Sequence, residues 1–331
     1  MTMLLKLLRP GNFSTRPIEG GVSELYKTTI NNSDQWLLAR GNSKDLPILL
    51  MLHGGPGFTD MWLSETCNGE LEKHFIVVNW DQRGAGKSFD KKTDPKQLTI
   101  EQFVEDGKEV IDHLLEKFNQ QKLYLLGQSW GSVLGWKLAR AVPNKLHHYI
   151  GVGQVSNMLE SENRSYTYAL EAARKDGNKK AIKELESLEM PAPNDGIDPF
   201  KALMKQRNWL AYYGGMMKGA KKLSAISKLL MGAKEYSFSD MLRFNKGMKV
   251  STSHMWHQLL GVRFFEEDLK SEIPITFILG ENDHTVDAAL SKELFEQINA
   301  PSKNMVMLHA AHMPNISSVS AYSDAIKHVL N

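Results

Sequence analysis

The sequence predicts an α/β fold in which a mostly parallel sheet is flanked by helices and carries a helical cap insertion. Short apolar runs alternate along the chain with stretches of helical periodicity, as in parallel strands joined by crossover helices. The alternation stops between residues 155 and 265, where helical periodicity continues without a clear strand. With 42% hydrophobic and 24% charged residues among 331, the composition is that of a globular protein and excludes wholesale disorder.

The first predicted element is a β-hairpin. Two alternating runs at 24–30 and 35–40 are joined by four turn-forming residues, Asn-Asn-Ser-Asp. Six further apolar runs suit strands buried on both faces; they are Pro47–Leu52, Phe75–Trp80, Leu123–Leu126, Tyr149–Val152, Ile275–Leu279 and Asn304–Leu308. Three stretches between them have helical periodicity, and they are Thr99–Phe118, Trp130–Val142 and Val286–Ile298.

The segment that breaks the alternation differs in composition from the rest of the chain. It holds 9 of the 16 methionines and 18 Lys/Arg against 11 Asp/Glu. We predict a core domain of residues 1–154 and 266–331 and a helical cap domain of residues 155–265. Methionine suits a lid that repacks around variable apolar ligands. The basic stretch Met216–Lys234 also resembles a membrane-surface helix, which is the alternative to a lid packed on the core.

Charge, cysteine content and the N-terminus limit partners and compartment. A net charge of +2 lacks the basic excess of nucleic-acid binders, so no nucleic-acid partner is expected. The lone Cys67 cannot form an intrachain disulfide. Lys6 and Arg9 interrupt the apolar N-terminus, which argues against a signal peptide, and no stretch is apolar enough for stable membrane insertion. We therefore expect a cytoplasmic protein; the oligomeric state is left open.

A Gly-x-Ser-x-Gly motif at 127–131 follows a predicted strand and opens the next predicted helix. A sharp strand-to-helix turn of this kind exposes the serine hydroxyl at the C-terminal edge of a sheet, and close packing requires glycine on either side. The serine is Ser129, which we predict to be a nucleophile. The alternative is that Ser129 only caps the helix.

The turn after the strand predicted at 47–52 reads His-Gly-Gly-Pro-Gly at 53–57. Acyl transfer needs two N–H donors for the negative oxygen of the tetrahedral intermediate. Gly54 or Gly55 is predicted to supply one donor, and Trp130, the residue after the nucleophile, the other. A tight turn that needs glycine for its conformation is the alternative interpretation.

A serine nucleophile needs a base, and the base needs a carboxylate that fixes its tautomer. The expected chain order is serine, acid, histidine. Asp283, in the loop after a late strand, is the predicted acid, with Glu281 and Asp287 as weaker rivals. His312, in the loop after the last strand, is the predicted base, whereas His309 lies nearer the strand and is expected to be structural.

The loop at 80–88 ends in Gly-Lys-Ser, as phosphate-binding loops do. Such a loop needs glycine five residues before Gly86, where Asp81 stands, so that interpretation fails. We expect Asp81 and Arg83 instead to pair and brace the glycine turn. The sequence shows neither a dinucleotide fingerprint in its first βα unit nor convincing metal-ligand spacing, so no metal or organic cofactor is expected.

These motifs together resemble those of an α/β-hydrolase of the proline iminopeptidase type, the peptidase family S33. The resemblance rests on the motifs at 53–57, 81–88 and 127–132, with Asp283 and His312 where the family's acid and base fall. It covers roughly residues 20–154 and 266–331 and implies the α/β-hydrolase fold and a serine hydrolase that needs no cofactor.

The resemblance also implies a small-molecule or short-peptide substrate whose free ammonium group is held by cap glutamates. Glu160 and Glu162 are the candidates, although exposed carboxylates at a helix start are the other interpretation. Removal of an N-terminal residue, above all proline, is the first expected activity. Hydrolysis of a hydrophobic ester is the second, and a ligand-binding protein without turnover is the third.

Overall fold

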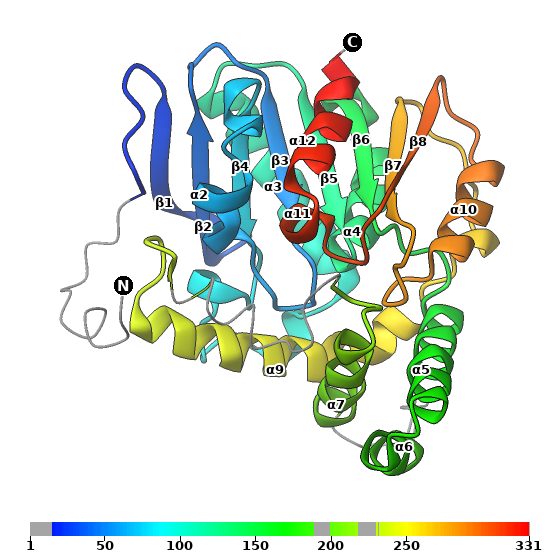
Figure 1. Cartoon of the computed structure of the whole chain (residues 1–331). Helices are drawn as coiled ribbons and strands as arrows, with labels where there is room; N and C mark the ends of the chain where they lie inside the picture. Colours follow the sequence, from blue (N-terminus) through cyan, green and yellow to red (C-terminus); the bar gives the residue numbers. More distant parts are fainter. Residues whose placement is uncertain (1–14, 189–198, 218–229, 231, 331) are drawn as a thin grey trace.

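The structure is a computed structural model that describes residues 15–188, 199–217, 230 and 232–330. Eight strands form one sheet in the order β1-β2-β4-β3-β5-β6-β7-β8 (Figure 1). Strands β3 to β8 pair in parallel with one another, whereas β2 is antiparallel to β1 and β4. The predicted sheet is confirmed, and its strands are β1 (Val22–Ile30), β2 (Ser33–Gly41), β3 (Ile48–Leu52), β4 (Ile76–Asp81), β5 (Leu123–Gln128), β6 (Leu146–Val152), β7 (Ile275–Gly280) and β8 (Lys303–Leu308).

The β1–β2 hairpin has a shorter turn than the sequence predicts. Only Asn31 and Asn32 lie between the strands, with φ angles of 42° and 60°. Two successive positive φ angles match the right-handed twist of a hairpin, and asparagine tolerates them better than most residues. The strand register therefore continues through Ser33 and Asp34, which the sequence analysis assigned to the turn.

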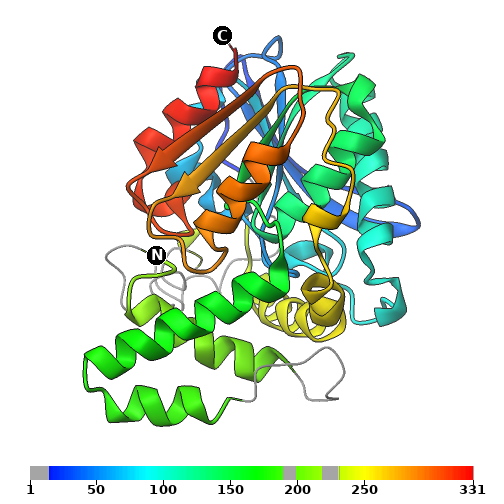
Figure 2. The same cartoon turned by 90° about the vertical axis from the view of Figure 1, so that its right-hand side faces the viewer.

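Helices cover both faces of the sheet (Figure 2). The predicted helices are α3 (Ile100–Lys117), α4 (Trp130–Ala141) and α10 (Ala288–Gln297), and they pack in one apolar cluster with alternate strand residues such as Leu50 and Leu52. On the opposite face, α12 (Val319–Lys327), which the sequence analysis did not predict, packs with Leu49 and Met51. Burial of both faces explains why β3 is apolar at every position.

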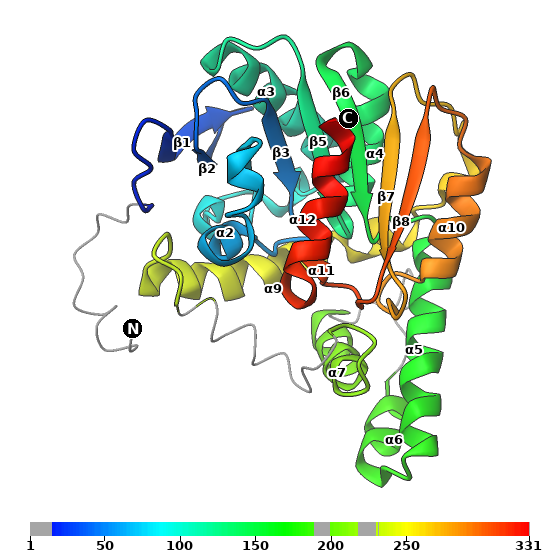
Figure 3. The same ribbon diagram turned by 45° about the horizontal axis from the view of Figure 1, so that its top comes forward.

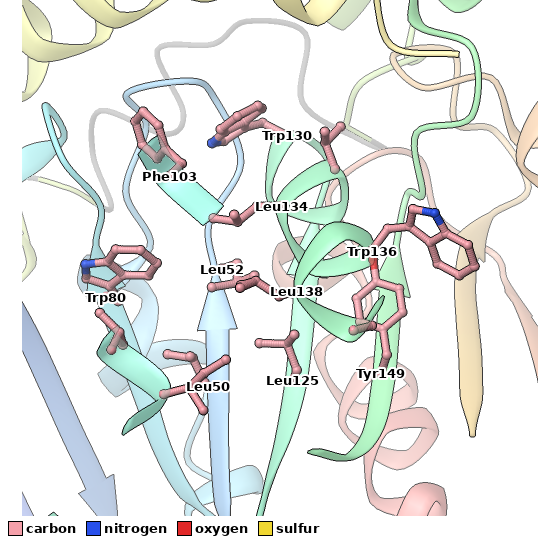
Figure 4. Packing of buried hydrophobic residues seen from close by; sticks show 14 of the residues in the cluster. Leu50, Leu52, Trp80, Phe103, Leu125, Trp130, Leu134, Trp136, Leu138 and Tyr149 are labelled. Carbon is pink, nitrogen blue, oxygen red and sulfur yellow. The ribbon is translucent and has the colours of Figure 1, made fainter. Parts of the chain in front are cut away.

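Large side chains fill the layer between β3, β5 and α4 (Figure 4). Leu50 and Leu52 of β3 lie beside Leu134 and Leu138 of α4, and all four are fully buried. At the end of this layer, the ring of Trp130 meets Phe103 of α3 edge to face, with centroids 5.5 Å apart. The packing holds the start of α4 against the sheet edge, where the predicted nucleophile lies.

The segment between β6 and β7 is helical in its described part. It contains α5 (Met158–Lys175), α6 (Lys179–Glu186), α7 (Pro199–Tyr212) and α9 (Phe238–Leu260). These helices lie together at one end of the sheet, with α9 running along the sheet edge (Figures 1 and 3). Their treatment as a separate cap domain stays a prediction.

The stretch Met216–Lys234 was interpreted from the sequence either as part of a lid packed on the core or as a membrane-surface helix. Most of it falls outside the described residues. Its described members Met217 and Leu230 are buried in an apolar cluster with Trp62 and Phe244. None of the helices in the described ranges combines the length and apolarity that crossing a bilayer requires.

Candidate active site

Ser129 occupies a strained turn between β5 and α4. Its φ of 54° and ψ of −121° place its backbone in a region that residues other than glycine rarely adopt. A Cβ added at Gly127 would overlap the carbonyl oxygen of Gly131, and one added at Gly131 would overlap that of Leu52. Both glycines are therefore required for the turn. Ser129 makes no side-chain capping hydrogen bond to α4, so its interpretation as a mere helix cap is wrong.

A buried histidine and carboxylate meet beside this turn. His312 Nδ1 lies 2.8 Å from Asp283 Oδ2, and both side chains are almost fully buried. The other oxygen of Asp283 accepts hydrogen bonds from the backbone N–H groups of Thr285 and Val286, at 2.9 and 3.0 Å. These bonds orient the carboxylate toward the ring, so that Asp283 binds Nδ1 and Nε2 is the ring nitrogen left outside this pair.

Gly153, at the end of β6, forms the wall behind the pair. Its φ is +52°, and a Cβ there would lie 3.2 Å from both Asp283 Oδ2 and His312 Nδ1. Glycine therefore meets two needs at this position, a left-handed backbone and close approach to the buried pair.

The rival residues from the sequence analysis lie elsewhere. Glu281 and His309 form a pair of their own at 2.9 Å on the surface. Asp287 caps α10 by accepting the backbone N–H of Leu290 and also pairs with Arg164. None of these three lines the cavity next to Ser129.

The turn at 53–57 passes close to Ser129. A Cβ on Gly54 would lie 3.4 Å from Ser129 Cβ and 3.9 Å from its Oγ. Burial lowers the pKa of His53 to about 4, so its ring is neutral at neutral pH. Its Nε2 accepts the backbone N–H of Gln82, and Nδ1 bonds to the carbonyl oxygen of Gly54. Gln82 also accepts the Trp130 indole N–H at 2.9 Å, which ties the two sides of the predicted oxyanion hole together.

A cavity of about 560 Å³ opens at Ser129 and His312. Gly54, Gly55 and Trp130 are in its wall. Six methionines also line it, five of them from the segment 155–265, and they are Met158, Met204, Met216, Met241, Met248 and Met313. The described part of the chain gathers no group of three His, Cys, Asp or Glu side chains that could hold a metal ion.

The α/β hydrolase fold family matches residues 47–319, more than three quarters of the chain. The chain belongs to this family. A probable aminopeptidase, YbaC of Bacillus subtilis, is 30% identical over 94% of this chain and 97% of its own length. The solved proline iminopeptidase-related protein TTHA1809 of Thermus thermophilus is 22% identical, with a TM-score of 0.61 over 93% of this chain and 97% of that one. A Bacillus megaterium epoxide hydrolase is 19% identical, with a TM-score of 0.58 over 92% and 100%.

The predicted resemblance to the proline iminopeptidase type is thus confirmed, since relatives named aminopeptidase and proline iminopeptidase match the chain. The epoxide hydrolase shows that a protein named for a different reaction shares this fold.

The expected Asp81–Arg83 pair is wrong. The Arg83 guanidinium turns toward α3 and binds both oxygens of the buried Asp106 at 2.8 Å. Asp81, at the end of β4, faces the segment 155–265 and accepts hydrogen bonds from Tyr236 and Thr59. The two side chains diverge because their positions face different layers of the hydrolase fold.

The loop at 81–88 nevertheless braces the site. Lys87 donates its backbone N–H to Asp81 at 2.7 Å, and a Cβ on Gly86 would overlap the Asp81 carboxylate. The Lys87 ammonium then binds Asp240 at the start of α9 and the carbonyl oxygen of Glu235. This buried network joins the end of β4 to the helical segment.

The structure does not bring Glu160 or Glu162 to the cavity. Glu160, 43% exposed, pairs with Arg164 one turn along α5. Glu162 is buried and pairs with Arg207 of α7. Arg207 itself does line the cavity, but its charge is already countered.

Asp60, three positions after the turn at 53–57, also lines the cavity and was not predicted from the sequence. Burial first, and the nearby Asp81 second, raise the pKa of Asp60 to about 7. Its place in the apolar stretch 58–63 was the available signal, because a carboxylate in such a stretch is seldom buried without a reason.

Proposed function

We propose that this α/β hydrolase is a serine hydrolase that cleaves an amide or ester through an acyl-enzyme. The observation that carries the proposal is the buried His312–Asp283 pair, whose histidine lines the same cavity as Ser129. His312 Nε2 would accept the Ser129 proton as Oγ attacks the substrate carbonyl. Asp283 would hold the imidazolium that forms.

The negative oxygen of the tetrahedral intermediate would bind two backbone N–H groups. Trp130 N–H stands at the start of α4, where the helix dipole adds to the donor strength. Gly54 or Gly55 would supply the second donor. His312 would then protonate the leaving group, and water activated by the same ring would release the acyl group from Ser129.

For the substrate, we propose the amide bond after an N-terminal residue, with proline as the first candidate. Support comes from the relative named probable aminopeptidase, whose similarity extends over nearly the whole chain. The methionine-lined cavity favours a second candidate, a small hydrophobic ester, because thioether side chains repack around apolar groups of different shape.

Initial rates on L-proline p-nitroanilide and on p-nitrophenyl butyrate test both candidates. Wild type is compared with Ser129→Ala and His312→Ala, and with His309→Ala as a matched surface control. Cleavage of the anilide that depends on Ser129 and His312 supports the aminopeptidase. Cleavage of the ester alone favours the esterase.

A fluorophosphonate probe separates a hydrolase from a binding protein. Labelling of wild type but not of Ser129→Ala is expected, since the probe reacts with an activated serine. An unlabelled, folded wild-type protein would contradict the proposal and favour the third candidate, a ligand-binding protein without turnover.

A further inference from the structure

Asp60 is a buried carboxylate without a partner. The side chain is 6% exposed and forms part of the wall of the cavity that contains Ser129. It makes no capping bond to the short helical turn that follows it. Within the described ranges, neither of its oxygens has a hydrogen-bond donor or a cationic partner.

The nearby Asp81 shows what a satisfied buried carboxylate looks like here. Asp81 accepts hydrogen bonds from Tyr236, Thr59 and the backbone N–H of Lys87. The Lys87 ammonium adds a favourable charge. These three donors therefore go to Asp81, and Asp60 receives none of them.

The other charged groups of the cavity wall already have partners. Arg207 is paired with Glu162, and His312 with Asp283. Asp81 raises the pKa of Asp60, and Asp60 in turn raises the pKa of the Cys67 thiol and of the Tyr322 hydroxyl, so none of these interacting groups is a cation. Among the ionisable side chains of the described wall, the Asp60 carboxyl is thus the one without a partner.

A buried carboxylate is costly unless it is protonated or meets a cation. Burial and Asp81 hold the pKa of Asp60 at about 7, so its proton is easily lost near neutral pH. A protonated amine that enters the cavity would find apolar thioether walls and one carboxylate. A charge-assisted hydrogen bond between this amine and the Asp60 carboxylate would compensate both groups for the water that they lose.

We propose that Asp60 is a specificity-determining residue that binds the protonated amine of the substrate. The counter-charge for the amine then comes from the loop after β3, on the same segment as the oxyanion turn, and not from Glu160 or Glu162 of α5. This inference rests on the proposed function, because it names the substrate class of the same cavity.

Ligand binding to the Ser129→Ala protein, measured by calorimetry, tests the inference without turnover. Two matched pairs differ only in the amine: L-prolinamide against cyclopentanecarboxamide, and L-leucinamide against 4-methylpentanamide. We expect the amines to bind more tightly. Adding Asp60→Asn should weaken amine binding about 10- to 100-fold and leave the neutral amides unchanged.

Proton release provides a second readout that a purely structural role would not affect. Burial raises the pKa of Asp60 to about 7, so near pH 6.5 part of the carboxyl is protonated when the cavity is empty and would ionise when an amine binds. Calorimetry in buffers of different ionisation enthalpy should therefore show a proton released on binding of L-prolinamide, and none with Asp60→Asn.

Two further variants guard against misfolding. Asp60→Glu keeps the charge and should retain the preference for amines, while Glu70→Gln removes an exposed carboxylate and should change nothing. Equal affinity for amines and neutral amides, or equal loss of both in Asp60→Asn, overturns the inference. A preserved preference together with a protein that the fluorophosphonate does not label would instead contradict only the serine hydrolase.

Discussion

Two histidine–carboxylate pairs join the same two loops, after β7 and β8, yet they differ in almost everything but distance. His312–Asp283 spans 2.8 Å and His309–Glu281 spans 2.9 Å. The side chains of the first pair are 6% and 2% exposed, and those of the second 74% and 49%. Distance alone therefore does not identify a catalytic pair. We proposed the catalytic role for the pair that is buried beside Ser129, because a dry site strengthens the interaction and fixes the ring.

The comparison is tested most severely by removing each histidine. His312→Ala should lower kcat on the preferred substrate by about 10⁵-fold or more, because loss of the base of a serine triad has an effect of that order. His309→Ala should stay within about twofold, since an exposed pair contributes little. Steady-state kinetics on both variants measure the difference. Similar losses in the two variants would contradict the assignment of the base.

Substitution of the two carboxylates should also affect kcat more in the buried pair than in the exposed pair, but less than substitution of His312. Asp283→Asn keeps the shape of the side chain but no longer fixes the tautomer of His312, and kcat should fall about 10⁴-fold. Glu281→Gln removes the matching surface charge and should leave kcat unchanged. A larger loss in Glu281→Gln than in Asp283→Asn would exchange the roles of the two acids.

Substitution of Gly153, which forms the wall behind the His312–Asp283 pair, should lower kcat by a smaller factor. Gly153→Ala would put a methyl group 3.2 Å from Asp283 Oδ2 and His312 Nδ1, and a shift of the pair should reduce kcat about 10- to 100-fold. Gly177→Ala is the matched control, since Gly177 also has a positive φ but open space around it. Equal kcat for the two variants would show that the wall does not position the pair.

The smallest expected effect is on thermal stability, because the buried Asp60 carboxyl has no partner among the described residues and lowers the free energy of unfolding when it ionises. The pKa of Asp60 is raised to about 7, while unfolded aspartate ionises near pH 4. Between these values the folded protein keeps a proton that the unfolded chain loses, so this group's contribution to stability falls as pH rises. Asp60→Asn removes this pH-dependent loss of stability because the amide does not ionise. The Tm of the variant should therefore exceed that of wild type by roughly 2–5 °C at pH 8.

That difference in Tm should shrink toward about pH 4, where the carboxyl is protonated in both states. Thermal melts of both proteins from pH 4 to pH 8 check this. A lower Tm for Asp60→Asn at pH 8 would mean that the carboxylate stabilises the empty cavity, contrary to the partner-free environment described above.

Much of this molecule was determined by local sequence. Strand, turn and helix follow one another directly around Ser129, and glycines stand where the backbone leaves no room for a Cβ. The parallel strands β7 and β8 end at one edge, so their loops had to bring Asp283 and His312 close together. Periodicity and spacing were sufficient for these predictions because they report backbone geometry.

Tertiary structure alone decided which charges meet. Arg83 binds Asp106 and not Asp81, Glu162 binds Arg207, and Asp60 is left without a partner in the cavity wall. These outcomes depend on how helices and loops distant in sequence pack side by side. Periodicity shows which face of an element is buried, but the partner of a buried charge is chosen by the neighbouring elements that packing brings within hydrogen-bond distance.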